Sequence, residues 1–334
     1  MARGRSRRRA GEVNGHGEFD IIARIKARAA RSMGMRDDVV LGIGDDAALL
    51  QPPGGRLLVA ATDTLNEAVH FPVETAPADI GWKALAVNLS DLAAMGATPS
   101  WCTLSLSLHD AQPAWLDAFL DGFLALASQH GVALVGGDTT RGPVSISVTA
   151  LGHVDPGTAL RRAGARVDDD IWVTGTLGDA AAALSQWRAG GAAEPALRER
   201  LDRPTPRVEA GRALARIAHA CIDVSDGLLA DLGHLCTASD VGARLDLDAL
   251  PASPTLRAMF TDETRRVLQT SGGDDYELCF TAASAQRDAI IALGTTAGVA
   301  VTRIGRIVAG GDVVACIGLE TWQPPRRGFD HFSG

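Results

Sequence analysis

The sequence predicts an α/β protein (α+β) of two domains, and three observations lead to this prediction. Its 334 residues are long for one domain and comfortable for two. Segments with the two-residue period of strands alternate with segments of helical period in both halves of the chain. Residues 155–169, which contain Pro156, Gly157, Gly164 and a charge cluster, interrupt this alternation and predict a domain boundary.

The first half is expected to mix strands and helices. Apolar residues at helical spacing predict an amphipathic helix over 18–31. A helix over 77–95 is predicted because Pro77 suits a first turn and Gly96 suits a stop. Residues 101–108 alternate and predict a strand with one apolar face. That face consists of Cys102, Leu104, Leu106 and Leu108, and the other expected elements are strands at 56–62, 132–135 and 144–154 and a helix at 113–130.

The second half restarts with a strand at 171–174 and a helix that begins at Asp179. Its further expected elements are a helix at 207–218 and strands near 244–247, 277–281 and 301–308. We therefore expect a disordered Arg-rich tail over 1–17, an N-terminal domain over 18–155 and a C-terminal domain over 156–334.

Composition excludes several classes of function. Hydrophobic residues make up 46% and charged residues 22%, the balance of a globular protein with a sizeable core. No apolar run reaches the roughly 18 residues of a membrane span, and the start lacks a signal-peptide core, so we expect a cytoplasmic protein without membrane contact.

A net charge of -8 argues against nucleic acid as a partner, and the Arg-rich start is interpreted as a tail rather than an RNA-binding arm. Five scattered cysteines without a CxxC pair argue against disulfides and structural zinc.

Aspartates in glycine-rich or turn-like contexts are the most informative feature of the chain. Each follows or precedes an apolar segment, and glycine lets the backbone approach a ligand closely. The motifs are GIGDDAAL at 42–49, ATDTL at 61–65, NLSDLAAMG at 88–96, GGDTTRG at 136–142, IDVSDG at 222–227 and SGGDDYEL at 271–278.

These carboxylates would need a positive partner if the fold brought them together. Two like charges about 4 Å apart cost on the order of 4 kcal/mol at an effective dielectric constant near 20. The chain has two lysines, Lys26 and Lys83, and neither lies beside the GIGDD or IDVSDG motif in sequence. Carboxylates, hydroxyls and carbonyls suit Mg²⁺ with substrate phosphates, whereas zinc prefers His and Cys.

A purely structural interpretation competes with this one, because Asp caps helices and Gly supplies positive φ in turns. Any one motif alone is more typical of a turn, and Asp45, Asp179 and Asp231 are interpreted as structural, helix-start or surface residues. Six such motifs together favour a metal–phosphate site. The P-loop, GxGxxG and protein-kinase signatures are absent from the sequence.

In this order and spacing, the six motifs resemble those of thiamine-monophosphate kinases, from about Phe19 to the closing GFDHF at 328–332. KALAVNLSDLAAMGA and GGDTTRGP carry most of the specificity. The resemblance implies a two-domain fold shared with aminoimidazole-ribonucleotide synthetase and selenophosphate synthetase. It also implies a homodimer in which the N-terminal mixed sheet pairs across the two-fold axis, and an ATP cleft that the C-terminal domain completes.

The resemblance further implies a role for each matching residue. Several Mg²⁺ ions would be held by Asp46, Thr62, Asp63, Asp91, Asp138, Asp223 and Asp226. ATP would contact Gly137, Asp138, Arg162 and Ser225, and thiamine monophosphate would contact His70, Asp274 and Phe329. From the residues alone, His70 is interpreted as a polar residue at a strand end. Arg162, with Arg161 beside it, is compatible with an exposed charge, and Phe329 is equally a packing residue.

Three positions depart from the family pattern. Ala61 replaces a frequent hydroxyl residue, so only its backbone carbonyl is available to a metal. Asp121 stands where an aromatic residue often faces the nucleotide, and Asp274 is one methylene shorter than the usual glutamate.

The implied activity is direct in-line transfer of the ATP γ-phosphoryl group to thiamine monophosphate, giving thiamine diphosphate. A phosphate nucleophile is already anionic at neutral pH, so we assign no covalent intermediate and no catalytic base, and Cys221 and Cys279 are not nucleophiles. Two alternatives stay open. One is another enzyme of the superfamily, although no Cys precedes Cys102 as a selenophosphate synthetase would require. The other is a nucleotide-binding scaffold without catalysis.

Overall fold

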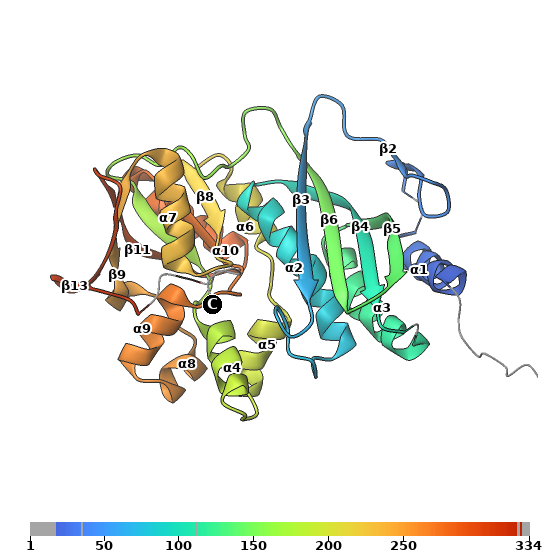
Figure 1. The fold of residues 1–334 in the computed structure, drawn as a ribbon. Helices are drawn as coiled ribbons and strands as arrows, with labels where there is room; N and C mark the ends of the chain where they lie inside the picture. Colours follow the sequence, from blue (N-terminus) through green and yellow to red (C-terminus); the bar gives the residue numbers. More distant parts are fainter. Residues whose placement is uncertain (1–17, 35, 111, 326–327, 329–334) are drawn as a thin grey trace, which may run out of the picture.

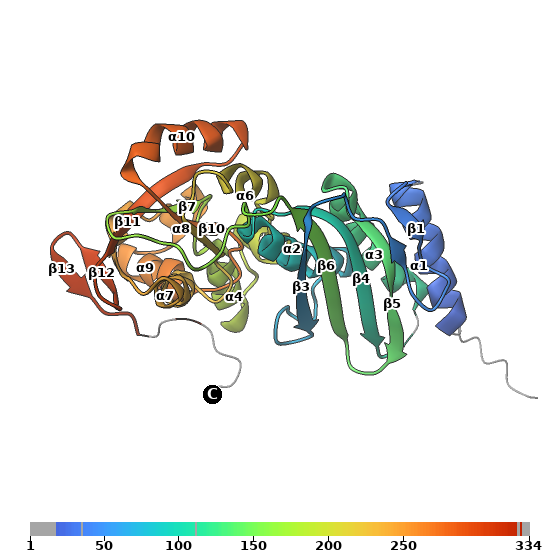
Figure 2. The ribbon, with the colours of Figure 1, turned by 90° about the horizontal axis from the view of Figure 1, so that it is seen from above.

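The computed structural model describes residues 18–34, 36–110, 112–325 and 328. Two α/β halves lie side by side, each built on its own sheet (Figures 1 and 2). This confirms the predicted mixed α/β architecture in two parts, while the predicted tail over 1–17 lies outside the described residues. Within the described residues, no helix is long and apolar enough to cross a membrane.

The N-terminal half contains a four-stranded sheet in the order β3-β6-β4-β5. Only β4 and β5 pair in parallel, and the other neighbours are antiparallel. Helices α2 and α3 cover one face, and α1 packs beside α3 and β5 (Figure 2). The bounds are α1 Glu18–Met33, β1 Val39–Leu41, β2 Leu49–Leu50, β3 Leu57–Asn66, α2 Pro77–Ala94, β4 Thr98–Leu108, α3 Pro113–Gln129, β5 Ala133–Arg141 and β6 Ser145–Val154.

The two faces of this sheet differ in chemistry. Toward the helices, Cys102, Leu104, Leu106 and Leu108 are buried on one face of β4, as predicted. The opposite face carries hydroxyl groups in rows that run across the strands. The register aligns Thr62 with Thr149 and Thr103, then Thr64 with Ser147, Ser105 and Asp138, then Asn66 with Ser145, Ser107 and Thr140.

The C-terminal half contains a seven-stranded mixed sheet in the order β13-β12-β9-β11-β7-β10-β8. All neighbours are antiparallel except β12 and β9. The strands are β7 Asp170–Thr174, β8 Ala220–Asp223, β9 Gly242–Asp246, β10 Leu278–Ala282, β11 Val301–Val308, β12 Val313–Ile317 and β13 Glu320–Trp322. The helices are α4 Asp179–Arg188, α5 Pro195–Asp202, α6 Val208–Leu214, α7 Leu228–Ser239, α8 Pro254–Met259, α9 Asp262–Ser271 and α10 Arg287–Thr296.

Several element bounds differ from the predicted ones. Strand β5 continues through Gly136 and Gly137 to Arg141, because pairing with β4 continues past a register shift. Strand β3 continues to Asn66, and the helix expected over 207–218 spans only Val208–Leu214. All five cysteines are buried free thiols, as their scattered spacing indicated.

Helix α2 lies between the two halves and contacts elements of both, including β3, β6, α6 and β8. Its N-terminal part approaches α3 so closely that side chains are excluded at the crossing. A Cβ on Gly122 would lie 1.7 Å from the carbonyl oxygen of Ala78, and a Cβ on Gly81 would lie 2.0 Å from that of Phe119. Glycine at both positions therefore sets the distance between α2 and α3.

We expect Gly122→Ala to lower the free energy of unfolding by about 2–3 kcal/mol, because the added methyl must push two backbones apart. Gly233→Ala in α7 is the matched control, since no atom lies within 4 Å of its added Cβ. Greater helix propensity should make that control neutral or up to about 1 kcal/mol more stable. Urea unfolding followed by circular dichroism measures both, and equal midpoints would contradict the crossing constraint.

Candidate active site

A cavity of about 630 Å³ opens between the two halves. Strand β3 and helix α2 line it from the N-terminal half, and α4, α9 and the loops after β8 and α9 line it from the C-terminal half. The cavity has a volume usual for small-molecule sites. Eight of the predicted site residues line it, namely Thr62, Asp63, His70, Asp91, Asp223, Ser225, Asp226 and Asp274.

Four aspartates from four segments gather at one end of the cavity. Asp63 lies on β3, Asp91 on α2, Asp223 at the end of β8, and Asp226 in the turn that leads into α7. The Asn88 side-chain oxygen accepts a hydrogen bond from the Asp63 backbone N–H at 3.0 Å. The Ser90 hydroxyl donates to Asp223 at 2.7 Å. Two buried side chains of α2 thus fix aspartates that belong to different halves of the chain.

The aspartate cluster is electrostatically strained. Burial, with the charges of Asp223 and Asp63, raises the pKa of Asp91 to about 8. Burial raises the pKa of Asp223 to about 6, although the Ser90 hydrogen bond lowers it. Burial also raises the pKa of Asp63, and the charge of Asp226 adds to that shift. Raised pKa values of this origin mean that the cluster favours protons or cations over free carboxylates.

Arg162 brings positive charge to the cluster from the segment that joins the halves. Its charge lowers the pKa values of Asp91 and Asp223. The Ser239 hydroxyl holds this segment by donating to the Arg162 carbonyl at 2.9 Å and accepting from the N–H groups of Gly164 and Ala165 at 3.1 Å. The backbone of this segment is thus fixed, whereas the Arg162 side chain is exposed and does not line the cavity.

Asp231 corrects one interpretation from the sequence. It is only 3% exposed, and a single carboxylate oxygen accepts from the backbone N–H groups of Ser225, Asp226 and Gly227 at 3.0–3.1 Å. Burial and the charges of Asp223 and Asp226 raise its pKa to about 7. Asp231 thus lies in the first turn of α7, as expected of a helix-start residue, but it is not a surface residue, and it holds the turn that presents Ser225 and Asp226.

The loop over 272–277 forms a second polar part of the cavity. Asp274 and Tyr276 have left-handed backbones, with φ of 68° and 50°, a conformation that is costly for tyrosine. The Tyr276 hydroxyl donates to Asp274 at 3.0 Å, and the Lys83 ammonium pairs with the same carboxylate at 3.0 Å. His70 faces this cavity, and its Nδ1 accepts from the Asn66 backbone N–H, so a neutral His70 carries its proton on Nε2.

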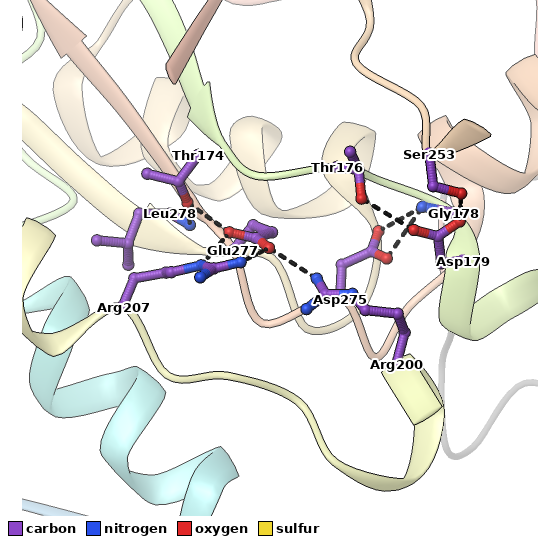
Figure 3. A network of polar contacts seen from close by, with 10 residues as sticks. All are labelled: Thr174, Thr176, Gly178, Asp179, Arg200, Arg207, Ser253, Asp275, Glu277 and Leu278. Atoms are coloured by element: carbon purple, nitrogen blue, oxygen red, sulfur yellow. Dashed lines mark hydrogen bonds and ion pairs between the residues drawn. The ribbon is translucent and has the colours of Figure 1, made fainter. Parts of the chain in front are cut away.

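Two buried carboxylates hold the strained loop in place. Glu277 is fully buried and pairs with Arg200 at 2.7 Å and Arg207 at 2.5 Å, and the Thr174 hydroxyl donates to it (Figure 3). Asp275 accepts from the Gly178 N–H at 2.9 Å, and burial raises the pKa of this carboxyl well above its usual range. These contacts flank Asp274 and Tyr276 and fix where their side chains point.

Apolar side chains line the rest of the cavity, away from the aspartates. They come from the loop after β3 and from helices α4 and α9. The residues are Val69, Ala181, Leu184, Val267 and Leu268, with Arg188 beside them. The cavity thus combines an acidic part with an apolar part that is suited to an organic ring system.

Other predicted site residues lie elsewhere in this chain. Asp46, Gly137 and Asp138 are exposed and do not line the cavity. Asp138 is on β5, which two strands separate from β3. Phe329 lies outside the described residues, although its neighbour Gly328 approaches the Asp226 carbonyl. Asp121 pairs with Arg28 and does not line the cavity.

The acidic cluster offers oxygen donors to a metal ion. Among the described residues, no three His, Cys, Asp or Glu side chains are arranged to hold one metal ion by themselves. Mg²⁺ usually takes one or two carboxylates together with water and phosphate oxygens. The oxygen donors and mutually raised pKa values of the cluster fit that chemistry, provided that substrate completes the coordination.

The supporting residues Lys83, Asn88, Ser90 and Asp231 were not among the site residues predicted from the sequence. What marks them in the sequence is that each is a polar residue within an otherwise apolar segment, as in KALAVNLSDLAAM at 83–95. Lys83, Asn88 and Ser90 are almost fully buried on α2. Buried polar side chains need partners, so such positions can be recognised as candidates before their partners are known.

Comparisons with known proteins identify the family of this chain. Residues 44–154 match the family model "AIR synthase related protein, N-terminal domain", and residues 166–317 match "AIR synthase related protein, C-terminal domain". The curated thiamine-monophosphate kinase of Escherichia coli (strain K12) is 46% identical over 327 residues, covering 95% of this chain and 98% of the relative.

Solved structures give the same result. Thiamine-monophosphate kinase from Stenotrophomonas maltophilia K279a has a TM-score of 0.83 and 57% identity, covering 89% of this chain and 96% of that one. AaThiL complexed with AMPPCP and TMP has a TM-score of 0.74 and 31% identity, covering 98% and 99% of the two chains. This chain belongs to the thiamine-monophosphate kinase family.

Proposed function

We propose that this chain phosphorylates thiamine monophosphate with ATP, giving thiamine diphosphate and ADP, as its family name implies. The observation that carries the proposal is one cavity of about 630 Å³ in which four aspartates from both halves adjoin an apolar recess. The acidic part suits the metal-bound phosphates, and the apolar part with His70 and Asp274 suits the rings of thiamine. A relative of 31% identity that was solved with an ATP analogue and TMP supports the same pairing of ligands.

The residues of the cavity would bind and orient two polyanions. Thr62, Asp63, Asp91, Asp223 and Asp226 would hold Mg²⁺, which neutralises phosphate charge and stabilises the transition state of the transfer. Ser225 and Arg162 would position the nucleotide at the same end. The acceptor phosphate is anionic at neutral pH. The site therefore needs to position the two reactants and does not need a general base.

We also propose that the protein is a homodimer in which the N-terminal mixed sheet pairs across the two-fold axis. Strand β3 is a long sheet edge on which Leu57 and Leu58 are 52% and 56% exposed. An exposed edge of this kind favours pairing with another chain. Asp46, Gly137 and Asp138, which do not line the cavity of this chain, would contribute to the site from the second copy. Light scattering should give twice 34.8 kDa, and a mass of one chain would refute the dimer.

The reaction is tested by incubating the full chain with thiamine monophosphate, ATP and Mg²⁺ and identifying products by chromatography and mass. We expect thiamine diphosphate with stoichiometric ADP, and loss of both products with EDTA. ATP binding without thiamine diphosphate would reject the kinase proposal and favour a binding-only protein. Product from another superfamily substrate alone would identify a different enzyme.

Replacement of Asp91 by Asn tests the acidic cluster. We expect kcat/KM to fall at least about 100-fold, because the variant removes one metal-directed charge from the transition state. The Mg²⁺ concentration at half-maximal rate should rise as well. Asp168→Asn, whose side chain is 73% exposed and does not line the cavity, is the control and should match the wild type. Near-normal turnover of Asp91→Asn at low Mg²⁺ would contradict the metal assignment.

A further inference from the structure

A buried lysine lies beside the cavity, between two of the predicted substrate contacts, His70 and Asp274. Lys83 projects from α2 and its side chain is only 2% exposed. Its ammonium group pairs with Asp274 at 3.0 Å and donates to the backbone carbonyl of His70 at 3.1 Å. One cation therefore contacts the His70 loop of the N-terminal half and the Asp274 loop of the C-terminal half.

The position of Lys83 follows from the helix. Lys83, Val87 and Asp91 are spaced by four residues and lie along one side of α2. Val87 and Asp91 line the cavity, so this side of the helix faces it. Asp91 belongs to the acidic cluster, whereas Lys83 lies two turns away at Asp274. The same helix face thus serves both ends of the cavity.

Burying an ammonium group is costly unless it is paired, and this chain contains only two lysines. Asp274 is 25% exposed and sits on a left-handed backbone, so its side chain needs fixed partners to keep one orientation. The Tyr276 hydroxyl and Lys83 provide these partners. Helix α2 and the His70 carbonyl fix the position of the Lys83 ammonium group. The ammonium group in turn fixes the position of the Asp274 carboxylate.

We propose that Lys83 is a positioning residue that holds Asp274 for the acceptor substrate. This inference rests on the proposed kinase function and deepens it. Lys83 acts through Asp274 rather than on the phosphates, so it should govern the binding of thiamine monophosphate and leave ATP binding largely unchanged. Lys83 also links α2, the helix that carries Asp91, to the part of the cavity that would bind thiamine monophosphate.

Steady-state kinetics of Lys83→Met test the inference. We expect the KM for thiamine monophosphate to rise about tenfold or more, the size of a coupled contact, with the KM for ATP changed by less than about twofold. Arg203→Met is the matched control, because Arg203 pairs with Asp79 of the same helix at 2.5 Å and lies outside the cavity. The control should leave both KM values unchanged. An equal rise in both KM values for Lys83→Met, or no rise, would overturn the inference.

A double-variant cycle separates positioning from general damage. If Lys83 acts through Asp274, Lys83→Met combined with Asp274→Asn should have nearly the KM of Asp274→Asn alone. If the effects of the two substitutions on KM multiply in the double variant, Lys83 acts independently of Asp274, and the proposal is overturned. Lys83→Gln, which retains a hydrogen-bond donor, replaces Lys83→Met in this cycle if the latter has lost its cooperative thermal transition. Failure of the wild type to form thiamine diphosphate would instead reject the kinase function itself, so the two failures are distinguishable.

Discussion

Polar side chains buried along α2 determine where the acidic residues of three other segments stand. Asn88 holds β3 at Asp63, Ser90 holds β8 at Asp223, and Lys83 holds the loop at Asp274. Each contact is worth little alone, but leaving any one of these buried groups unpaired costs about 1–3 kcal/mol. The helix therefore cannot turn or slide without breaking several contacts at once, and its glycine-mediated crossing with α3 anchors its other side. The site lies between the two halves, but helix α2 fixes the positions of its acidic residues.

The same arrangement concentrates negative charge that the protein alone does not neutralise. Burial and mutual repulsion raise the pKa values of Asp63, Asp91 and Asp223, while Arg162 offsets only part of the effect. Asp231 adds another buried carboxylate, which is satisfied by three backbone N–H groups. The surrounding contacts hold the carboxylates together against this repulsion. Such preorganised charge is characteristic of sites that bind cationic partners and phosphates without rearranging.

The sequence predicted the two α/β halves from its periodicity. The resemblance of its aspartate motifs to those of thiamine-monophosphate kinases predicted that Asp63, Asp91, Asp223 and Asp226 share one metal site. The sequence did not predict the roles of Lys83, Asn88 and Ser90. Helix α2 is buried nearly all round, so periodicity does not distinguish the face toward the cavity from the face toward the sheet. Asp231 was misjudged because an acidic residue in the first turn of a helix is ordinary. Strand β5 was predicted too short because Gly136 and Gly137 resemble a stop, whereas pairing with β4 carries the strand onward.

The buried thiols have a practical consequence for studying motion between the halves. Burial raises the pKa of Cys236 to about 11 and that of Cys102 higher still, so little thiolate exists at neutral pH. All five cysteines are shielded from solvent, and maleimides react with exposed thiolates. The native cysteines should therefore react little with maleimide dyes, so that the dyes label introduced cysteines selectively. Cysteines introduced at exposed Val73 and Met259, one in each half, would carry a donor–acceptor pair without removing any native thiol.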